Sequence, residues 1–419
     1  MKLLHQTCLA ALALLMPASA LAADVKVTVT NEQKTQRQEL VEIDARTVYQ
    51  KLGIAEGQNI IVKNAMRQQV AYQITYDGKL LIDAAVKPCG KTVFTITPGN
   101  PEPMRSWVEG KMYPLRKDDI AWENDRGAYR VYGPQLQKSG ERSFGIDVWT
   151  KNSPDLNVPE RYYKDYEGNV RGYEIGKNGR KDEWIDLHTS FHLDHGKGLD
   201  CYGVGPSLGC GTPALMDGDK LIFPYCYRKY RIVDNGPLRF TVELTYNPVK
   251  IKNDENVVEH RIISLDKGSN FNKMTVWYSG LTSPCDLASG VVVHTADTES
   301  VVIGKNYVQY ADPTDQPERH GFQLYVAALF PDGAKCRKLL YDKPEGAIAG
   351  HALGIIKDIK ADQKYTYYFG SAWSEYDVRN QDEWQVRIDG FLNAYALQRG
   401  LPSPRGGFTA PSPRRPMRQ

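Results

Sequence analysis

Short runs of apolar and β-branched residues alternate with polar positions along most of the chain. These runs are rich in Val, Thr, Tyr, Phe and Ile and are separated by Asp-Gly, Asn-Gly or Pro steps, a pattern typical of antiparallel strands joined by turns. The clearest runs cover residues 25–31, 72–82, 92–97, 239–249, 271–280, 289–295, 322–330 and 364–370. The pattern therefore predicts a mostly β protein, a large antiparallel β-sandwich with few helices.

Helical periodicity is credible mainly in two segments, residues 45–54 and residues 380–400. In the second segment, apolar residues recur near helical spacing at Trp384, Ile388, Phe391 and Leu392. The chain shows no internal repeat of about 20 to 50 residues, which argues against a propeller or a solenoid.

Proline, glycine and acidic residues cluster over residues 97–118. Such a composition is typical of a junction, so we expect an N-terminal β module over residues 23–100 and a main catalytic body over residues 101–398. Residues 399–419 are rich in proline and basic side chains and have little to bury. We expect them to form a disordered tail.

The first 22 residues have the pattern of a secretory signal peptide. Lys2 precedes an apolar run at residues 9–16, and the small-residue sequence Ala-Leu-Ala follows at residues 20–22. Cleavage is expected after Ala22, which predicts a periplasmic or secreted protein. No later segment approaches about 18 apolar residues, so neither a membrane span nor an anchor is expected.

Composition narrows the class of function. Hydrophobic residues make up 41% of the chain and charged residues 25%, with a formal net charge of +3. These values are typical of a globular protein and argue against a dedicated nucleic-acid binder. The 25 tyrosines and seven tryptophans suit β-structure and also provide flat, amphipathic rings on which sugars stack.

Six cysteines follow the leader: Cys89, Cys201, Cys210, Cys226, Cys285 and Cys336. Their spacing forms no disulfide framework, and no Cys-x-x-Cys pair indicates zinc. One pair among Cys201, Cys210 and Cys226 is close enough in sequence to bridge a loop.

Residues 120–132 are the first candidate for chemistry. Read as one strand, this segment places Trp122, Asn124, Arg126 and Arg130 on one face, and Glu123, Asp125, Tyr129 and Val131 on the other. An aromatic ring, an amide and two guanidinium groups in a row suit a sugar that carries a carboxylate, because arginine matches both carboxylate oxygens. The alternative is a solvated strand face with cross-strand ion pairs.

Residues 186–200 hold three of the seven histidines that follow the leader. Read as a strand, they place Asp186, His188, Ser190, His192 and Asp194 on one face, with His195 beside it. Imidazole is the side chain best matched to proton transfer near neutral pH. A divalent cation bound by His188, His192 and Asp194 is the alternative, although the spacing matches no short zinc signature.

Six glycines follow within residues 196–211, beginning just before and after Lys197. Tight turns and close backbone approach are expected here. The segment lacks the Gly-Lys-Ser/Thr ending of a phosphate loop. It is interpreted either as a loop lining a cleft beside the histidines or as a structural Ω-loop.

Three segments together resemble a known family. Residues 118–134 (DDIAWENDRGAYRVYGP), 191–215 (FHLDHGKGLDCYGVGPSLGCGTPAL) and 367–373 (YYFGSAW) are similar to the domain of unknown function 4861 family, with a resemblance that extends over residues 40–395. The family is found in exported proteins of polysaccharide-degrading bacteria. The resemblance implies a carbohydrate-active β-sandwich related to galactose-mutarotase-like folds, in a setting where dehydration of a terminal uronic acid occurs, as in ulvan breakdown.

The residues suggest how such a β-elimination would proceed. Arg126, helped by Asn124 or Arg130, would neutralise the uronate carboxylate. One of His188, His192 and His195 would remove the proton at C5, and a second histidine or a tyrosine would protonate the oxygen leaving C4. Trp122 would hold the sugar ring and Lys197 would assist at the carboxylate. No cofactor is required by this chemistry, although a divalent metal remains an option.

Three other functions stay open at this point. A glycoside hydrolase would use a carboxylate pair, for which Glu123 and Asp125 are the best-placed candidates. A non-catalytic protein would bind the oligosaccharide without turnover. A structural metal site would use His188 and His192.

Overall fold

The computed structural model describes residues 24–34, 36–177, 179, 181–224, 226–316, 318 and 322–399. The predicted signal peptide and nearly all of the predicted tail lie outside these residues. Among the helices described, none is long and apolar enough to cross a membrane. Every described cysteine is a free thiol, so the bridge considered among Cys201, Cys210 and Cys226 is not formed.

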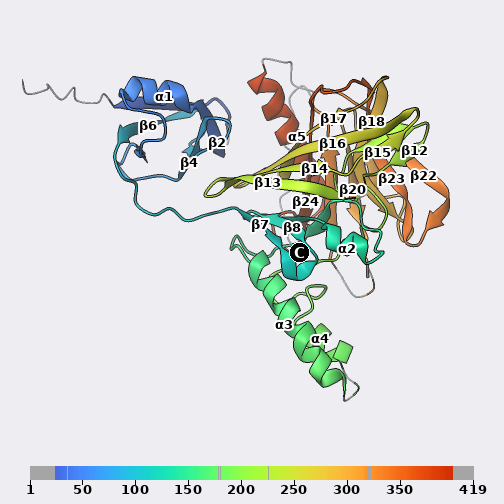
Figure 1. Cartoon of the computed structure of the whole chain (residues 1–419). Helices are drawn as coiled ribbons and strands as arrows, with labels where there is room; N and C mark the ends of the chain where they lie inside the picture. Colours follow the sequence, from blue (N-terminus) through green and yellow to red (C-terminus); the bar gives the residue numbers. More distant parts are fainter. Residues whose placement is uncertain are drawn as a thin grey trace, which may run out of the picture.

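Two small sheets and one helix form an N-terminal module with its own hydrophobic core (Figure 1). Its elements are β1 (Val25–Asn31), β2 (Arg37–Asp44), α1 (Ala45–Leu52), β3 (Ile60–Lys63), β4 (Tyr72–Ile74), β5 (Lys79–Val86) and β6 (Gly90–Pro98). The sheet orders are β1-β6-β3 and β2-β5-β4. Helix α1 begins where the Asp44 side chain accepts the Thr47 N–H and ends at Gly53 in the left-handed region, which confirms the predicted helix.

Two large antiparallel sheets form the main body, as the alternating pattern predicts. One has the order β12-β11-β18-β23-β22; the other has the order β13-β14-β16-β17-β24-β21-β20-β19, with β15 paired to β16. The strands are β11 (Ala214–Asp217), β12 (Lys220–Ile222), β13 (Tyr227–Asn235), β14 (Arg239–Tyr246), β15 (Val249–Ile251), β16 (Asp254–Asp266), β17 (Phe271–Ser279), β18 (Cys285–His294), β19 (Val301–Ile303), β20 (Tyr307–Asp312), β21 (Leu324–Leu329), β22 (Lys335–Glu345), β23 (Ile348–Ile359) and β24 (Tyr365–Trp373).

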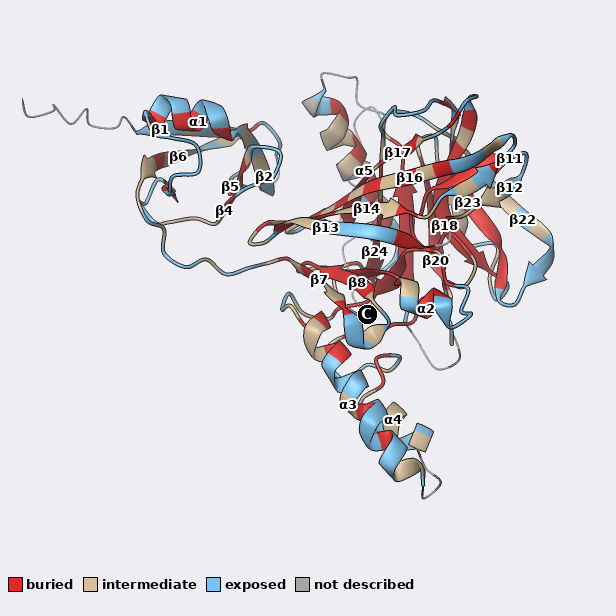
Figure 2. Ribbon diagram, in the orientation of Figure 1, coloured by how far each residue is buried: buried red, intermediate tan, exposed pale blue. Residues whose placement is uncertain are grey.

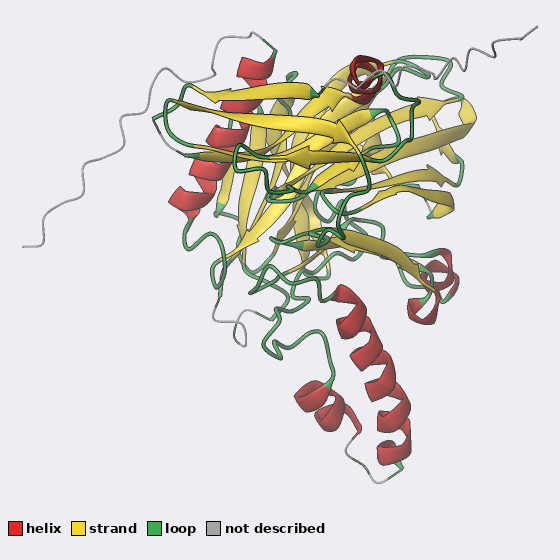
Figure 3. Ribbon diagram, turned by 90° about the vertical axis from the view of Figure 1, so that its left-hand side faces the viewer, coloured by secondary structure: helices red, strands yellow, loops and turns green. Residues whose placement is uncertain are grey.

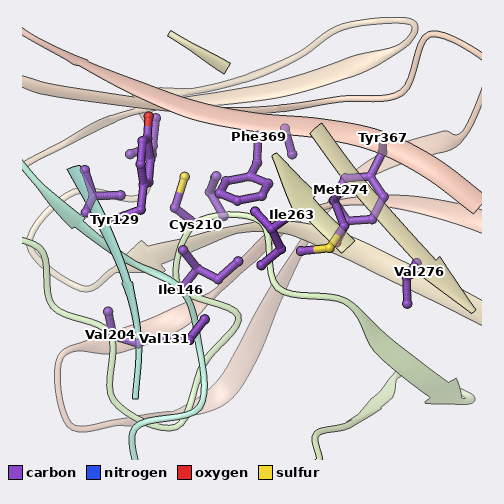
Figure 4. Packing of buried hydrophobic residues seen from close by; sticks show 14 of the residues in the cluster. Tyr129, Val131, Ile146, Val204, Cys210, Ile263, Met274, Val276, Tyr367 and Phe369 are labelled. Carbon is purple, nitrogen blue, oxygen red and sulfur yellow. The ribbon is translucent and has the colours of Figure 1, made fainter. Parts of the chain in front are cut away.

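The inner faces of these sheets share one large core. Figure 4 shows Ile263, Met274 and Phe369 of the larger sheet packed near Ile146 and Cys210, which come from the segments before β10 and β11. The large antiparallel β-sandwich is therefore confirmed.

Helix α5 (Gln381–Gln398) covers the outer face of the larger sheet. Its buried residues Trp384, Ile388 and Leu392 pack in one cluster with Phe271 and Leu329 of the sheet. The Asn380 side chain accepts the Glu383 N–H and caps the helix. This helix was predicted from its spacing of apolar residues.

A four-stranded sheet with the order β10-β9-β8-β7 lies beside the sandwich. Its segment comprises β7 (Glu109–Tyr113), the 3₁₀ helix η1 (Pro114–Arg116), β8 (Asp119–Glu123), β9 (Ala128–Val131), α2 (Pro134–Lys138) and β10 (Asp147–Trp149). The single strand predicted over residues 120–132 is wrong, because β8 and β9 form a hairpin. The Asn124 side chain accepts the N–H groups of Arg126 and Gly127 and thereby reverses the chain.

Helices α3 (Val158–Gly176) and α4 (Lys181–His188) form an arm that projects from this sheet (Figures 1 and 3). Much of its surface is exposed (Figure 2). The two helices approach closely where Gly168 and Gly172 lie against Thr189 and Ile185. The strand predicted over residues 186–200 is therefore wrong: this segment is the end of a helix followed by a loop.

Candidate active site

Trp122 belongs to the core of the body and cannot serve as the predicted sugar platform. Its side chain is 0% exposed, and its indole Nε1 donates to Asn272 Oδ1 at 2.8 Å. The ring stacks between Tyr129 and Phe240. Because β8 pairs Trp122 with Tyr129 and Ala121 with Arg130, the hairpin sends Trp122 and Arg130 to opposite faces.

Asn124 and Arg126 fix the hairpin turn to the connection between β16 and β17. Asn124 Nδ2 donates to the carbonyl oxygens of Asp266 at 2.6 Å and Ser269 at 2.8 Å. Arg126 donates from Nε to the Gly268 carbonyl at 2.6 Å and from Nη1 to Asp377 at 3.0 Å. Both side chains therefore make structural contacts at the hairpin turn, and their role at a uronate carboxylate stays a prediction.

The carboxylate pair proposed for hydrolysis is occupied by structural contacts. Glu123 Oε1 accepts the N–H groups of Asn157 at 2.8 Å and Val158 at 2.7 Å, at the start of α3. Its Oε2 lies 2.5 Å from Lys151 Nζ, and both side chains are almost fully buried. Asp125 accepts the Gly268 N–H at 2.6 Å. A carboxylate at a helix N-terminus with a buried ammonium partner is a structural arrangement.

Arg130 is the centre of a buried charge cluster. Its Nη2 lies 2.5 Å from Asp147 Oδ2 and 3.0 Å from Asp200 Oδ2, and Nη1 lies 3.7 Å from Asp119 Oδ2. Burial raises the pKa of Asp119 and raises that of Asp147 to about 8, although Arg130 opposes both shifts. Three carboxyl groups around one guanidinium group favour a retained proton. The structure therefore places Arg130 among buried carboxyl groups rather than on the exposed face that the single-strand prediction gave it.

Two of the three clustered histidines lie away from the main cleft. His188 ends α4, stacks on Trp184 with ring centroids 4.9 Å apart, and contacts the Trp184 carbonyl oxygen through Nδ1 at 2.9 Å. His195 is exposed, and its Nε2 lies 3.0 Å from the Ser190 carbonyl oxygen. Lys197 forms an ion pair with Glu160. The structure therefore does not bring His188, His195 and Lys197 together in one site.

His192 differs from its neighbours because it lines a large cleft. Its Nδ1 lies 3.1 Å from the carbonyl oxygen of Asp200, while 49% of the side chain is exposed. A carbonyl oxygen only accepts hydrogen bonds, so Nδ1 carries the proton in the neutral ring and Nε2 keeps a free lone pair. The aspartate that orients His192 also binds Arg130.

The cleft next to His192, called here the Arg116–His192 cleft, has a volume of about 620 Å³. It lies between the end of β7, η1, helix α3 and the loop after α4. Its lining residues are Lys111, Met112, Tyr113, Pro114, Leu115, Arg116, Lys117, Glu141, Pro159, Tyr162, Tyr163, Asp165, Tyr166, Asn169, Phe191 and His192. A cleft of this size suits a ligand of a few sugar rings.

Aromatic rings form much of the cleft wall. Tyr113 and Tyr162 stack with ring centroids 3.9 Å apart, and Phe191 packs with them in a small buried cluster. The guanidinium group of Arg116 lies 5.7 Å from the Phe191 ring centroid. The wall therefore combines flat apolar faces with a cation.

The charged side chains of the cleft influence one another. Burial raises the pKa of Asp165, while the nearby positive charge of Arg116 opposes the shift. Lys111 and Lys117 add two further cations at the edge. A carboxyl group that keeps its proton to a higher pH is suited to donate it, and imidazole is suited to accept one.

The sequence patterns missed Arg116 and Asp165. Arg116 lies in a 3₁₀ turn that has no periodic signature. Asp165 lies on α3, whose spacing of Tyr162, Tyr166 and Tyr173 is compatible with a helix but was not recognised as one. Both residues line the same cleft as His192 because the chain returns from the arm to the body near Phe191.

Two further histidines are buried in the sandwich. His294 Nδ1 lies 2.8 Å from Asp312 Oδ2, and this carboxylate raises the pKa of His294 despite burial. His351 accepts the Leu208 N–H at 3.1 Å, and burial lowers its pKa to about 3. Both rings fix loops to strands. Over the ranges that the structure describes, no three His, Cys, Asp or Glu side chains form a cluster that could hold a metal ion.

Comparison with known proteins identifies one matching family. Residues 29–396 match the family described as domain of unknown function (DUF4861). "Uncharacterized protein P7" of Formosa agariphila is 26% identical over 274 residues, which cover 63% of this chain and 62% of that protein.

Two solved structures show a weak overall similarity to this chain. An alpha-mannosidase from Enterococcus faecalis V583 superposes with a TM-score of 0.39 at 9% identity, over 87% of this chain and 45% of that one. A glycosyl hydrolase family 38 protein from Enterococcus faecalis superposes with a TM-score of 0.41 at 8% identity, over 87% and 46%. The chain spans less than half of either protein, and no activity is transferred from them.

Proposed function

We propose that this chain, which belongs to the DUF4861 family, is a carbohydrate-active enzyme that binds uronic-acid-containing oligosaccharides in the Arg116–His192 cleft. The observation that carries the proposal is the composition of this cleft: stacked aromatic rings, cations and one oriented imidazole line the same cavity. Aromatic faces suit sugar rings, and arginine suits the carboxylate that distinguishes a uronic acid.

The reaction that this set of groups supports best is β-elimination across C4 and C5. His192 Nε2 would remove the proton at C5, next to the carboxylate, since Nδ1 is held by the Asp200 carbonyl oxygen. Arg116 would neutralise the carboxylate and stabilise the enolate-like state that develops. A positioned base contributes typically about 10²- to 10⁴-fold to the rate.

The leaving oxygen at C4 needs a proton donor, and Asp165 is our candidate. Its raised pKa favours the protonated form at a pH where exposed carboxyl groups are ionised. The electron pair of the C5–H bond forms the C4–C5 double bond as the C4–O bond breaks, and the leaving oxygen receives the Asp165 proton. The product is water or an alcohol, with an unsaturated uronate.

One observation favours a second candidate, a glycoside hydrolase. Glu141 and Asp165 both line the cleft, and burial raises the pKa of Asp165, which suits the acid of a pair of carboxyl groups. This pair replaces Glu123 and Asp125. In that case Arg116 would still select the uronate, and His192 would only contact the sugar.

The experiment incubates the purified protein with oligosaccharide fragments of ulvan, polygalacturonate, alginate and glucuronan. Ultraviolet absorbance follows the conjugated double bond, and mass spectrometry identifies the products. A rise in absorbance with loss of one water from an intact fragment supports dehydration, and a rise with shorter fragments supports a lyase. Shorter fragments that have gained water, with no rise, support hydrolysis. Binding without any product would make the protein a carbohydrate-binding module, and no binding would contradict the proposal.

A further inference from the structure

One face of α3 carries a strip of exposed apolar side chains beyond the cleft. Tyr163, Tyr166, Val170 and Tyr173, defined here as the tyrosine strip, follow one another at spacings of three or four residues, so they lie along one side of the helix. Their exposed fractions are 58%, 42%, 49% and 69%. A row of exposed aromatic side chains indicates a binding surface unless another part of the protein covers it.

Packing within the arm does not cover the tyrosine strip. Helix α4 approaches α3 on its glycine side, where Gly168 and Gly172 meet Thr189 and Ile185. The helical positions of these glycines are rotated well away from those of Tyr166 and Tyr173. The strip is therefore left uncovered by the second helix of its own arm.

The strip is continuous with the Arg116–His192 cleft. Tyr163, Tyr166 and Asn169 line the cleft itself, while Val170 and Tyr173 lie further along the same side of α3. From Tyr166 to Tyr173 the helix advances by about 10 Å. Two linked sugar rings can span such a length.

The far end of the strip carries a cation. Lys177 Nζ lies 5.8 Å from the ring centroid of Tyr173. Glu174 lies beside them on the same turn and offsets this charge, so stacking on the rings, rather than net charge, is expected to supply most of the binding. A ring with an ammonium group beside it suits a sugar that carries a carboxylate.

We infer that the tyrosine strip is an extended subsite, on which the same uronic-acid oligosaccharide continues after it leaves the cleft. The inference rests on the proposed function of the cleft. It adds that the protein prefers fragments longer than the cleft, and that the arm formed by α3 and α4 binds substrate rather than serving only as structure.

The test measures the affinity of disaccharide and octasaccharide fragments from the panel above for the full chain and for Tyr173→Ala. Tyr173 is exposed and outside the cleft, so the variant should fold and bind the disaccharide normally. The octasaccharide should bind about tenfold more weakly, which corresponds to about 1.4 kcal/mol. Leu187→Ala, on the exposed surface of α4, is the matched control and should bind both fragments normally.

Three results would overturn the inference. Unchanged octasaccharide affinity in Tyr173→Ala would remove the subsite and leave the cleft intact. A change in molecular mass of Tyr173→Ala in light scattering, without a change in affinity, would make the strip a contact between copies of the chain. No binding of either fragment to the unmodified protein would overturn the inference together with the proposed function.

Discussion

Arg130 and Asp147 lie directly opposite each other on the neighbouring strands β9 and β10, with Arg130 Nη2 2.5 Å from Asp147 Oδ2. Asp200 shares the same nitrogen and holds His192 through its backbone carbonyl oxygen. The buried charge cluster and the cleft are therefore parts of one connected arrangement. A substitution of Arg130 should therefore also change the position of His192, because Asp200 contacts both residues.

The cluster predicts a specific dependence of stability on pH. Because burial raises the folded-state pKa of Asp147 to about 8, the folded state holds a proton that the unfolded state releases near pH 4. The free energy of unfolding should therefore fall as the pH rises from about 4 to about 8. Asp147→Asn removes this titration. The melting temperature of the variant, measured across that pH range, should therefore decline less than that of the unmodified protein. An equal decline in both proteins would contradict the shifted pKa.

Glu123 is predicted to support the fold rather than the chemistry. Glu123→Gln removes the negative partner of buried Lys151 and weakens the start of α3. A loss of about 3–5 kcal/mol in the free energy of unfolding is expected, because an unpaired buried charge remains. Urea denaturation measures it. Asp125→Asn is the control and should cost only about 1 kcal/mol, since one backbone N–H contact changes. A stable but inactive Glu123→Gln protein would instead support a catalytic carboxylate.

Arg116 is predicted to select the charged sugar. Arg116→Gln should weaken binding of a uronic-acid fragment by about 1.5–3 kcal/mol, the scale of a hydrogen bond to a charged group. The affinity of a neutral fragment of equal length should stay the same. Arg126→Gln is the matched control: it loses contacts with Asp377 and Gly268, so stability should fall while affinity does not. Calorimetric titration measures the affinity of each variant for the fragments. Equal losses of affinity in Arg116→Gln and Arg126→Gln would argue against the cleft as the binding site.

Strand periodicity and composition predicted the architecture, but of the residues that line the Arg116–His192 cleft they singled out only His192. Runs with a period of two predicted the strands of the sandwich, and apolar residues at helical spacing predicted α1 and α5. The hairpin was missed because a single side chain, Asn124, reverses a segment that otherwise alternates. Helix α3 was missed because its side toward α4 carries Gly168 and Gly172, whereas Tyr163, Tyr166 and Tyr173 stay exposed, so no apolar stripe marks a buried face beyond the first turns. Local patterns report which residues share a face, whereas the presence of Arg116 and His192 in one cleft depends on how distant segments pack.

The histidines provide the most direct test of the central claim. His192 and His195 lie in the same loop, both are exposed, and both contact a backbone carbonyl oxygen, but only His192 lines the Arg116–His192 cleft. The measurement is the initial rate of unsaturated product formation by His192→Ala and His195→Ala on whichever fragment the unmodified protein converts. His192→Ala should lose about 10²-fold or more of the rate, and His195→Ala should keep it. A normal rate in His192→Ala, with loss in His195→Ala, would contradict the assignment of this cleft as the site of the reaction.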